Sequence, residues 1–207
     1  MDPDRIVVTP LGVGDQWRPL PKEDSLARLA GLSLAAHFVL AVGNLHPRKN
    51  IPRLLRADLH LVLASQRSWR MGNIDWAIEE ESASNWVRFL GYVDDPSLVA
   101  LYSCADVVAY PSLYEGFGLP VLEALASGTM VVACNTTAIA EVAGEAAILV
   151  DPLDEAAIAE AIATAMTDER IRTNRRRAAR LQTARFTWDR SANLTVDASR
   201  AALARCR

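Results

Sequence analysis

The 207-residue sequence has only three cysteines, Cys104, Cys134 and Cys206, and no two of them form a CxxC pair. This spacing excludes the common cysteine zinc sites and the disulfide framework of a small secreted domain. Cys104 and Cys134 lie in apolar runs, which indicates free buried thiols in a reducing compartment. No group of histidine, cysteine and aspartate has the spacing of a metal site either, so we expect no metal and no cofactor.

Other features are also missing from the sequence. No apolar run reaches the roughly 18 residues of a membrane span, and residues 1–5 have no feature of a signal peptide. The net charge of −3 argues against general nucleic-acid binding. Neither a Gly-x-Ser-x-Gly nucleophile turn nor a Walker-type loop is present. We therefore expect a soluble, cytoplasmic protein.

Apolar segments, in contrast, are frequent, because 51% of the residues are hydrophobic. Six short apolar runs are typical of buried strands, at 38–42, 60–64, 87–90, 107–110, 130–133 and 148–150. Helical patterns lie between and after them, near 50–56, 73–83, 97–104, 119–127, 138–143, 154–167, 169–185 and 189–205. This alternation predicts an α/β fold with a doubly wound, Rossmann-like parallel sheet.

Two glutamates, Glu115 and Glu123, bracket a turn between the expected strand 107–110 and the following helix. Gly116 and Gly118 lack a Cβ atom, so the backbone of this turn can approach a ligand closely. A proline at position 120 fits the first turn of a helix, where its missing N–H is not needed. A strand, a glycine-bearing turn and a helix start are the arrangement with which an α/β sheet binds an anion.

The backbone N–H groups of Phe117, Gly118 and Leu119 are expected to be free donors at the positive end of this helix. We expect Glu115 on the loop and Glu123 in the first helical turn, both facing one cleft. Carboxylates accept hydrogen bonds from hydroxyls, so donors and acids together suggest a ligand with both phosphate and sugar. In the alternative interpretation, Glu123 only stabilises the helix N-terminus and Glu115 is a solvated loop residue.

A second site follows the first clear strand, in the run Gly43-Asn44-Leu45-His46-Pro47-Arg48-Lys49-Asn50. Arg48 and Lys49 lie where the carboxyl end of a strand meets a helix start, and both are suited to neutralise a diphosphate. Alternatively, either of them is a surface charge, and His46 is a loop residue rather than a catalyst.

The expected helix 169–185 carries a basic run. Its members can contact an anionic lipid surface or an acidic partner, or they form a solvated helix face. They are Arg170, Arg172, Arg175, Arg176, Arg177 and Arg180.

Together these motifs resemble the donor-binding, carboxyl-terminal half of retaining family-4 (group 1) glycosyltransferases. The resemblance rests on Pro47-Arg48-Lys49-Asn50, on Phe89-Leu90-Gly91-Tyr92-Val93, and on the run from Pro111-Ser112 through Glu115-Gly116-Phe117-Gly118-Leu119-Pro120 to Glu123-Ala124. It implies one half of a GT-B architecture, in which two Rossmann-like domains enclose the active site. It also implies transfer of a sugar from a UDP- or GDP-linked donor with retention and without a required metal.

The same resemblance implies a role for each residue. Lys49 and Arg48 would meet the diphosphate, Glu115 the donor sugar and Glu123 the ribose, while backbone near Tyr92 and Val93 frames the base. As catalytic residues it implies Glu115, Lys49 and Arg48. As donor-binding residues it implies Asn44, Tyr92, Val93, Gly116, Phe117, Gly118, Leu119 and Glu123.

The resemblance further divides the chain into three parts. Residues 1–22 would be a remnant strand at 6–9 with an interdomain linker, 23–187 the nucleotide-sugar-binding domain, and 188–207 a C-terminal crossover helix. An acceptor-binding domain is expected on a separate part or chain, or else self-association through the cleft face. A non-catalytic nucleotide-sugar-binding or assembly module is the alternative function.

Overall fold

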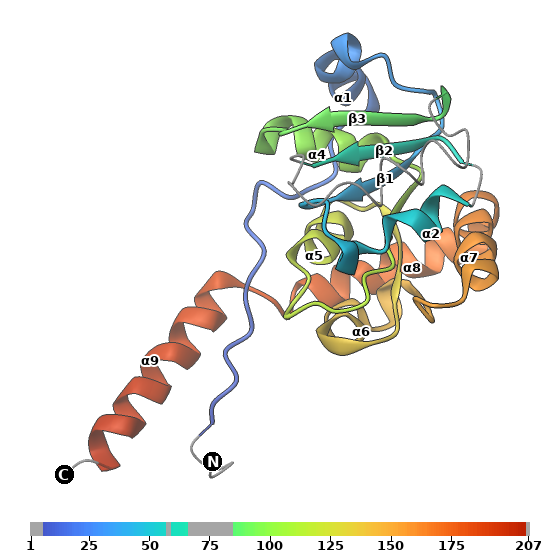
Figure 1. Cartoon of the computed structure of the whole chain (residues 1–207). Coiled ribbons are helices and arrows are strands. Elements are labelled where there is room, and N and C mark those ends of the chain that lie inside the picture. The colour runs from blue at the N-terminus through green and yellow to red at the C-terminus, as the bar shows by residue number, and fades with distance from the viewer. Residues whose placement is uncertain (1–5, 57–58, 66–84, 206–207) are drawn as a thin grey trace.

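The computed structural model describes residues 6–56, 59–65 and 85–205 (Figure 1). A six-stranded sheet has the order β3-β2-β1-β4-β5-β6, and every neighbouring pair is parallel. The strands are β1 (Val39–Val42), β2 (Leu61–Ala64), β3 (Val87–Gly91), β4 (Val107–Tyr110), β5 (Met130–Cys134) and β6 (Ile148–Val150). The predicted doubly wound α/β fold and its six strands are therefore confirmed.

The helices follow the predicted pattern with small shifts at their ends. They are α1 (Lys22–Leu29), α2 (Ile51–Leu55), α4 (Asp95–Cys104), α5 (Leu119–Ala126), α6 (Thr137–Ala143), α7 (Glu155–Thr167), α8 (Glu169–Thr183) and α9 (Trp188–Arg205). The helix expected at 73–83 lies outside the described residues. Helix α1 was not predicted, because it buries little more than Ser25 and Leu29 and so lacks a clear apolar period.

Side chains of the strands alternate between two apolar layers, as the two-residue period of a strand requires. Leu40, Val62, Val108 and Val131 point to a layer shared with α4 and α5, whereas Val39, Leu61, Val107 and Met130 point to a layer shared with α2 and α7. Helices therefore cover both faces of the sheet (Figure 1), which explains the unbroken apolar strand sequences.

Aspartates cap three of the helices. Asp94, Asp154 and Asp168 each accept a hydrogen bond from the backbone N–H three residues later, at the starts of α4, α7 and α8. Such caps satisfy one of the N–H groups that a helix N-terminus leaves unpaired.

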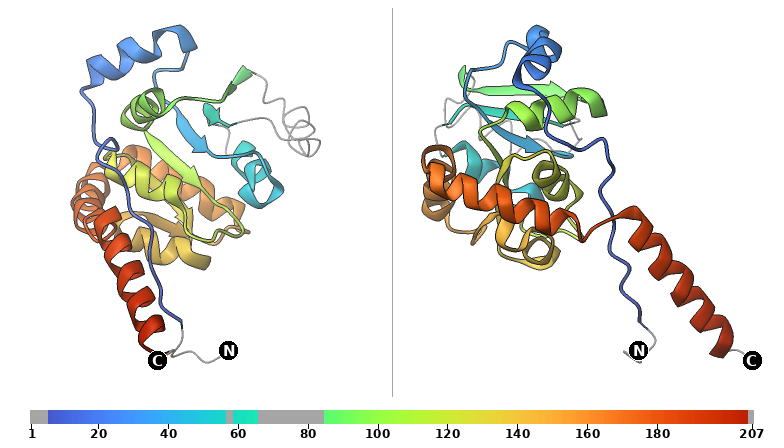
Figure 2. Two further views of the ribbon diagram at one scale, coloured as in Figure 1. Left: turned by 90° about the vertical axis from the view of Figure 1, so that its left-hand side faces the viewer. Right: turned by 180° about the vertical axis from the view of Figure 1, so that it is seen from behind.

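Residues 6–9, expected to form a strand, have no regular secondary structure, because no sheet edge lies beside them to pair with. This segment and α9 both extend away from the body of the domain (Figures 1 and 2). The chain after the first segment and the chain before α9 are joined at the domain surface, where the Val13 N–H donates to the Phe186 carbonyl at 3.0 Å. At Gly12, a Cβ atom would lie 2.2 Å from the Trp188 nitrogen, so only glycine fits there.

Of the two cysteines in the described part of the chain, Cys134 is buried, Cys104 is half-buried and both are free thiols. In the described residues no helix is both long and apolar enough to span a bilayer. Among the same residues, no group of three or more metal-binding side chains is found.

Candidate functional site

The site forms where the strand order of the sheet reverses. β1 lies between β2 and β4, so the chain continues to one side after β1 and to the other side after β4. The loops that follow these two strands diverge and leave a crevice, which is where doubly wound sheets bind ligands. Lys49 follows β1 and Glu115 follows β4, and their side chains meet there, with 2.8 Å between Lys49 Nζ and Glu115 Oε1.

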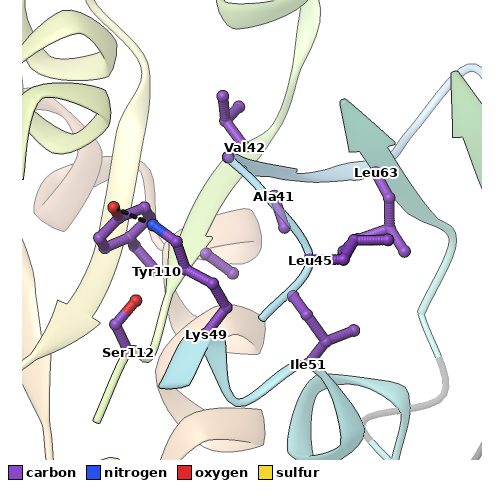
Figure 3. A pocket seen from close by; sticks show the side chains of 10 residues that line it. Ala41, Val42, Leu45, Lys49, Ile51, Leu63, Tyr110 and Ser112 are labelled. Atoms are coloured by element: carbon purple, nitrogen blue, oxygen red, sulfur yellow. Dashed lines mark hydrogen bonds between the residues drawn. The ribbon is translucent and has the colours of Figure 1, made fainter. Parts of the chain in front are cut away.

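Lys49 is held in a narrow, mainly apolar pocket beneath this crevice (Figure 3). Only 7% of its surface is exposed, and its ammonium group donates a hydrogen bond to the hydroxyl of Tyr110. The same nitrogen lies 4.2 Å from the centre of the Tyr110 ring. Gly43 forms the opposite wall, and a Cβ atom there would lie 3.1 Å from Nζ. The pocket therefore fixes the cation on three sides.

The surroundings shift the pKa values of this group in a consistent way. Burial lowers the pKa of Lys49 from its ordinary value, and the hydrogen bond and charge of Glu115 oppose this. Burial opposes ionisation of Glu115 too, but the hydrogen bond and charge of Lys49, together with the charge of Arg48, hold its pKa below its ordinary value. Burial, followed by the charge and hydrogen bond of Glu115, raises the pKa of Tyr110, so its hydroxyl stays protonated.

Arg48 is the second cation of the site. Its guanidinium Nη1 lies 3.6 Å from Glu115 Oε2, and 45% of its side chain is exposed. Its backbone carbonyl accepts a hydrogen bond from the Leu113 N–H at 2.7 Å, which joins the loop after β1 to the loop after β4. Arg48 is therefore the cation of this pair that faces solvent.

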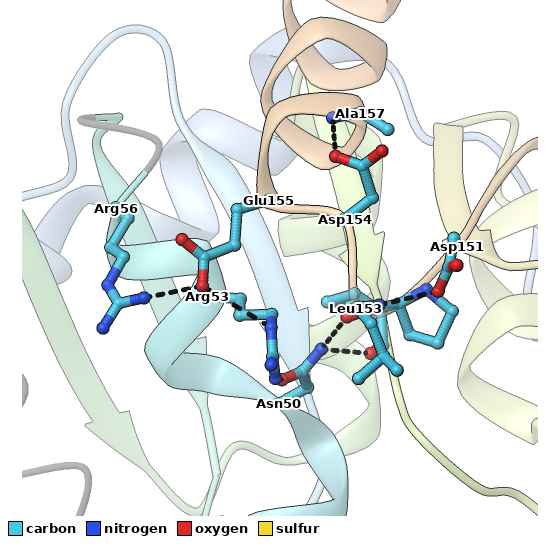
Figure 4. A network of polar contacts seen from close by, with 10 residues as sticks. Asn50, Arg53, Arg56, Asp151, Leu153, Asp154, Glu155 and Ala157 are labelled. Atoms are coloured by element: carbon cyan, nitrogen blue, oxygen red, sulfur yellow. Dashed lines mark hydrogen bonds and ion pairs between the residues drawn. The ribbon is translucent and has the colours of Figure 1, made fainter.

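A buried asparagine that sequence reasoning missed holds these loops together (Figure 4). The Asn50 side-chain amide donates to the carbonyls of Pro111 at 3.0 Å and Pro152 at 2.6 Å, which follow β4 and β6. Its carbonyl oxygen accepts from Arg53 at 2.6 Å. Asn50 adopts φ +60°, a left-handed conformation that asparagine tolerates better than most residues. It ends the short 3₁₀ helix Pro47–Lys49 and so fixes the direction of both cations.

Of the two glycines in the turn before α5, only Gly118 adopts a backbone conformation that favours glycine. Gly118 adopts φ +99°, and a Cβ atom there would lie 2.2 Å from Ile139 Cδ1, whereas a Cβ atom at Gly116 would meet nothing within 4 Å. Among the described residues, no acceptor lies opposite the N–H groups of Phe117, Gly118 and Leu119, which stand at the start of α5. Phe117 itself packs its ring edge-to-face on Phe186, with 5.8 Å between ring centres.

Glu123 lies elsewhere in α5 than predicted. The helix begins at Leu119, directly after its N-cap Gly118, so Glu123 is its fifth residue and lies in the second turn, not the first. Its Oε2 accepts a hydrogen bond from the Tyr102 hydroxyl at 3.2 Å. Burial raises the pKa of Glu123 to about 7, the Tyr102 hydrogen bond opposes this, and the charge of Asp95 adds to it.

Three further predicted residues share a second pocket at the same edge of the sheet. Asn44 follows β1 and Tyr92 and Val93 follow β3, and all three line it together with Gly91 and Asp95. Tyr92 is 73% exposed. Asp95, which lines this pocket, also raises the pKa of Glu123 through its charge.

The structure thus brings Arg48, Lys49 and Glu115 into direct contact, while Glu123 has a separate partner on α4. Sequence reasoning missed Tyr110, although its place as the last residue of β4 was a usable signal. It also missed Tyr102, for which a single sequence offers no signal, because the contact joins two helices. The roles of the predicted residues toward a ligand remain predictions.

The sheet, its switch point and the two pockets define a doubly wound α/β domain of the class that binds nucleotides at its strand ends. The family model described as glycosyl transferases group 1 matches residues 36–168. The chain therefore belongs to the group 1 glycosyltransferases, and the structure is the Rossmann-like half of a GT-B fold.

Curated relatives agree. The O-antigen chain mannosyltransferase B of Escherichia coli is 35% identical over 94% of this chain and 54% of its own length. The D-inositol 3-phosphate glycosyltransferase of Corynebacterium diphtheriae is 34% identical over 78% of this chain and 42% of its own. The chain thus spans about half or less of the length of these relatives.

Solved structures give the same fold. Sucrose-phosphate synthase of Thermosynechococcus elongatus superposes with a TM-score of 0.83 at 28% identity, over 95% of this chain and 52% of that one. The Anabaena protein HepE, solved in complex with UDP and glucose, has a TM-score of 0.76 at 22% identity, over 93% of this chain and 55% of that one.

Proposed function

We propose that this chain is the donor-binding domain of a glycosyltransferase that transfers a sugar from a nucleotide-diphosphate sugar with retention. One observation carries the proposal: Lys49 and Glu115 meet at the switch point of the sheet, beside the amino terminus of α5. A cation, a carboxylate and free backbone donors at one place match a ligand with phosphate and hydroxyl groups.

The geometry suggests a division of roles. Arg48 is exposed and near the crevice, so it can bind the diphosphate first, and Lys49 adds charge from below. Negative charge accumulates on the diphosphate as the glycosidic bond breaks, and these cations stabilise it more in the transition state than in the ground state. Glu115 then accepts hydrogen bonds from hydroxyls of the transferred sugar.

Glu123 is assigned to the ribose, and the pocket of Asn44, Tyr92 and Val93 to the base. Asp95 on α4 lines that pocket, and Tyr102 on the same helix donates to Glu123, so we propose that base and ribose bind as neighbours. An ionised Glu123 accepts hydrogen bonds from ribose hydroxyls, each worth about 1.5–3 kcal/mol.

The donor is proposed from the relatives. A mannosyltransferase of O-antigen chains is among the curated relatives, and another relative is an alpha-(1->4)-mannosyltransferase. A nucleotide-linked mannose is therefore the first donor to test, with UDP-glucose as the second because a structural neighbour was solved with UDP and glucose.

Transfer needs an acceptor site, which we assign to a separate domain or chain. The chain spans 54% of its mannosyltransferase relative, which leaves room for such a part. The exposed side chains of residues 6–8 and of α9 are the proposed contacts with it, or with a second copy of this chain.

Calorimetry with GDP-mannose and UDP-glucose tests donor binding. We expect one of them to bind, and we expect Arg48→Ala and Glu123→Gln each to weaken binding about tenfold or more. Glu160→Gln, a change of an acid on α7, is the matched control for charge and should bind like the wild type. A folded protein that binds neither donor would contradict the proposal.

The alternative is a module that binds nucleotide sugars without catalysing transfer. An assay of glycosyl transfer, with the chain produced together with an acceptor-binding half, distinguishes the enzyme from the binding module. Glycosyl transfer that is lost in Glu115→Gln supports the enzyme, whereas donor binding without transfer supports the module.

A further inference from the structure

A buried tyrosine on α4 holds the glutamate to which we assign the ribose. Tyr102 is 0% exposed, and its hydroxyl lies 3.2 Å from Glu123 Oε2. The contact joins α4 to α5, so it fixes the carboxylate from outside its own helix. No described residue donates to the other carboxylate oxygen, Oε1, which therefore remains for a ligand.

Tyr102 is itself fixed from several sides. The ring of Trp17 packs on it edge-to-face, with 5.7 Å between centres and an interplanar angle of 69°. The Thr129 hydroxyl donates to the Tyr102 carbonyl at 2.5 Å. The next residue, Ser103, accepts from the Leu20 N–H at 3.1 Å. The segment before α1 therefore supports the part of α4 that holds Glu123.

The direction of the pKa shift of Tyr102 agrees with a hydroxyl that stays protonated and donates its hydrogen bond to Glu123. Burial raises the pKa of Tyr102 far above its ordinary value, and the charge of Glu123 raises it further. On the described elements around α5, two titratable groups act on Glu123, namely Tyr102 and Asp95, both on α4. The first stabilises the ionised glutamate and the second destabilises it.

We propose that Tyr102 is a positioning residue: its hydroxyl holds the Glu123 carboxylate so that Oε1 accepts hydrogen bonds from the ribose of a bound nucleotide sugar. The inference rests on the proposed function, because it needs Glu123 to bind the donor. It adds a residue that touches no substrate and acts through Glu123.

The variant Tyr102→Phe removes only the hydroxyl. Calorimetry with GDP-mannose, and with UDP-glucose in parallel, should follow affinity between about pH 5.5 and about pH 9. Without the hydroxyl the glutamate ionises at higher pH. If the midpoint of the affinity curve moves up by about one unit, binding is about fivefold weaker near pH 7 and close to wild type near pH 9.

The matched control is Tyr114→Phe, which removes the hydroxyl of a 64% exposed tyrosine in the loop before Glu115. It should leave the midpoint unchanged. Equal weakening at every pH by Tyr102→Phe would indicate a merely structural role and overturn the inference.

Failure of the inference and failure of the proposed function are distinguishable. If Glu123→Gln binds both donors like the wild type, or neither donor binds, the proposed function fails. If Glu123→Gln weakens binding while Tyr102→Phe leaves the midpoint in place, only the inference fails.

The titration midpoint of Glu123 can also be measured without a ligand. Carbon NMR of labelled glutamate carboxyl groups, assigned with Glu123→Gln, should show a higher titration midpoint for Glu123 in Tyr102→Phe. Should that variant not fold, Trp17→Leu keeps the hydroxyl but removes its support, and a smaller shift in the same direction is expected. An unchanged midpoint in the variant measured would overturn the inference.

Discussion

At the scale of single residues, the site depends on a buried ion pair. Lys49 and Glu115 each have 8% exposed side chains, so neither can be solvated if the other is removed. Their attraction offsets the cost of burial only while both are present. Each of the two charges therefore needs the other in order to be buried, but the pair as a whole need not stabilise the fold.

This leads to a first prediction. Lys49→Met leaves Glu115 buried without its main partner, and we expect it to lower the free energy of unfolding by about 3 kcal/mol. The double variant Lys49→Met with Glu115→Leu removes both charges and should recover most of that loss. Urea denaturation measures both. A single variant as stable as the wild type would contradict the burial of the pair.

A second prediction concerns pH. The pKa of Glu123 is about 7 in the folded state and near 4.5 in the unfolded chain, so the folded state binds more protons between these values. The free energy of unfolding should therefore fall as pH rises from about 4.5 through about 7. Glu123→Gln cannot titrate, so its stability should change less over this interval. Thermal unfolding of the two proteins across the interval measures the difference, and parallel curves would contradict it.

The same titration should govern donor binding, which is a third prediction. Each phosphate of a nucleotide-diphosphate sugar has one ester linkage, one anhydride linkage and a single, strongly acidic ionisation, so neither titrates near neutral pH. Affinity should rise as pH increases through about 7, because the ionised glutamate accepts hydrogen bonds from ribose hydroxyls. Calorimetry at several pH values tests this. A flat profile in the wild type would place the ribose away from Glu123.

At the scale of elements, the turn before α5 has one glycine that cannot be replaced and one that can. Gly118→Ala would place a methyl group 2.2 Å from Ile139 in a left-handed backbone. We expect it to lower the free energy of unfolding by about 2 kcal/mol or more. Gly116→Ala is the matched control, since nothing lies within 4 Å of its added methyl group. Urea denaturation compares them, and equal stability of the two variants would contradict the strained turn.

The strands, most helices and the strand-end positions of Lys49 and Glu115 could be predicted, because apolar periodicity and parallel topology determine them together. Helix α1 and the role of Asn50 could not, since the first lacks an apolar period and the second depends on carbonyls from distant loops. The same reason explains why Tyr102 was missed. Contacts between side chains of separate elements leave no trace in local sequence patterns.

At the scale of the whole molecule, α9 and the segment before the domain expose apolar side chains. Ile6, Val8, Trp188 and Leu203 are each at least half exposed, and both segments extend away from the sheet (Figure 2). Such surfaces are usually covered by another protein part. We propose that the acceptor-binding half or a second copy of this chain covers these side chains.

A fifth prediction follows from this surface. The isolated chain should associate as its concentration rises, and Leu203→Asp on α9 should reduce that association. Leu181→Asp on α8 is the matched control, because both leucines are 70% exposed. Light scattering over a range of concentrations measures the mass. A monomer at every concentration, or equal effects of the two variants, would contradict a role for α9.

The close approach of Gly12 to Trp188 and the bond between Val13 and Phe186 have a mechanical consequence. The two terminal segments therefore leave the domain side by side at one place on its surface. A change in the backbone path of either segment at this place displaces the other, because Gly12 has no room to move toward Trp188.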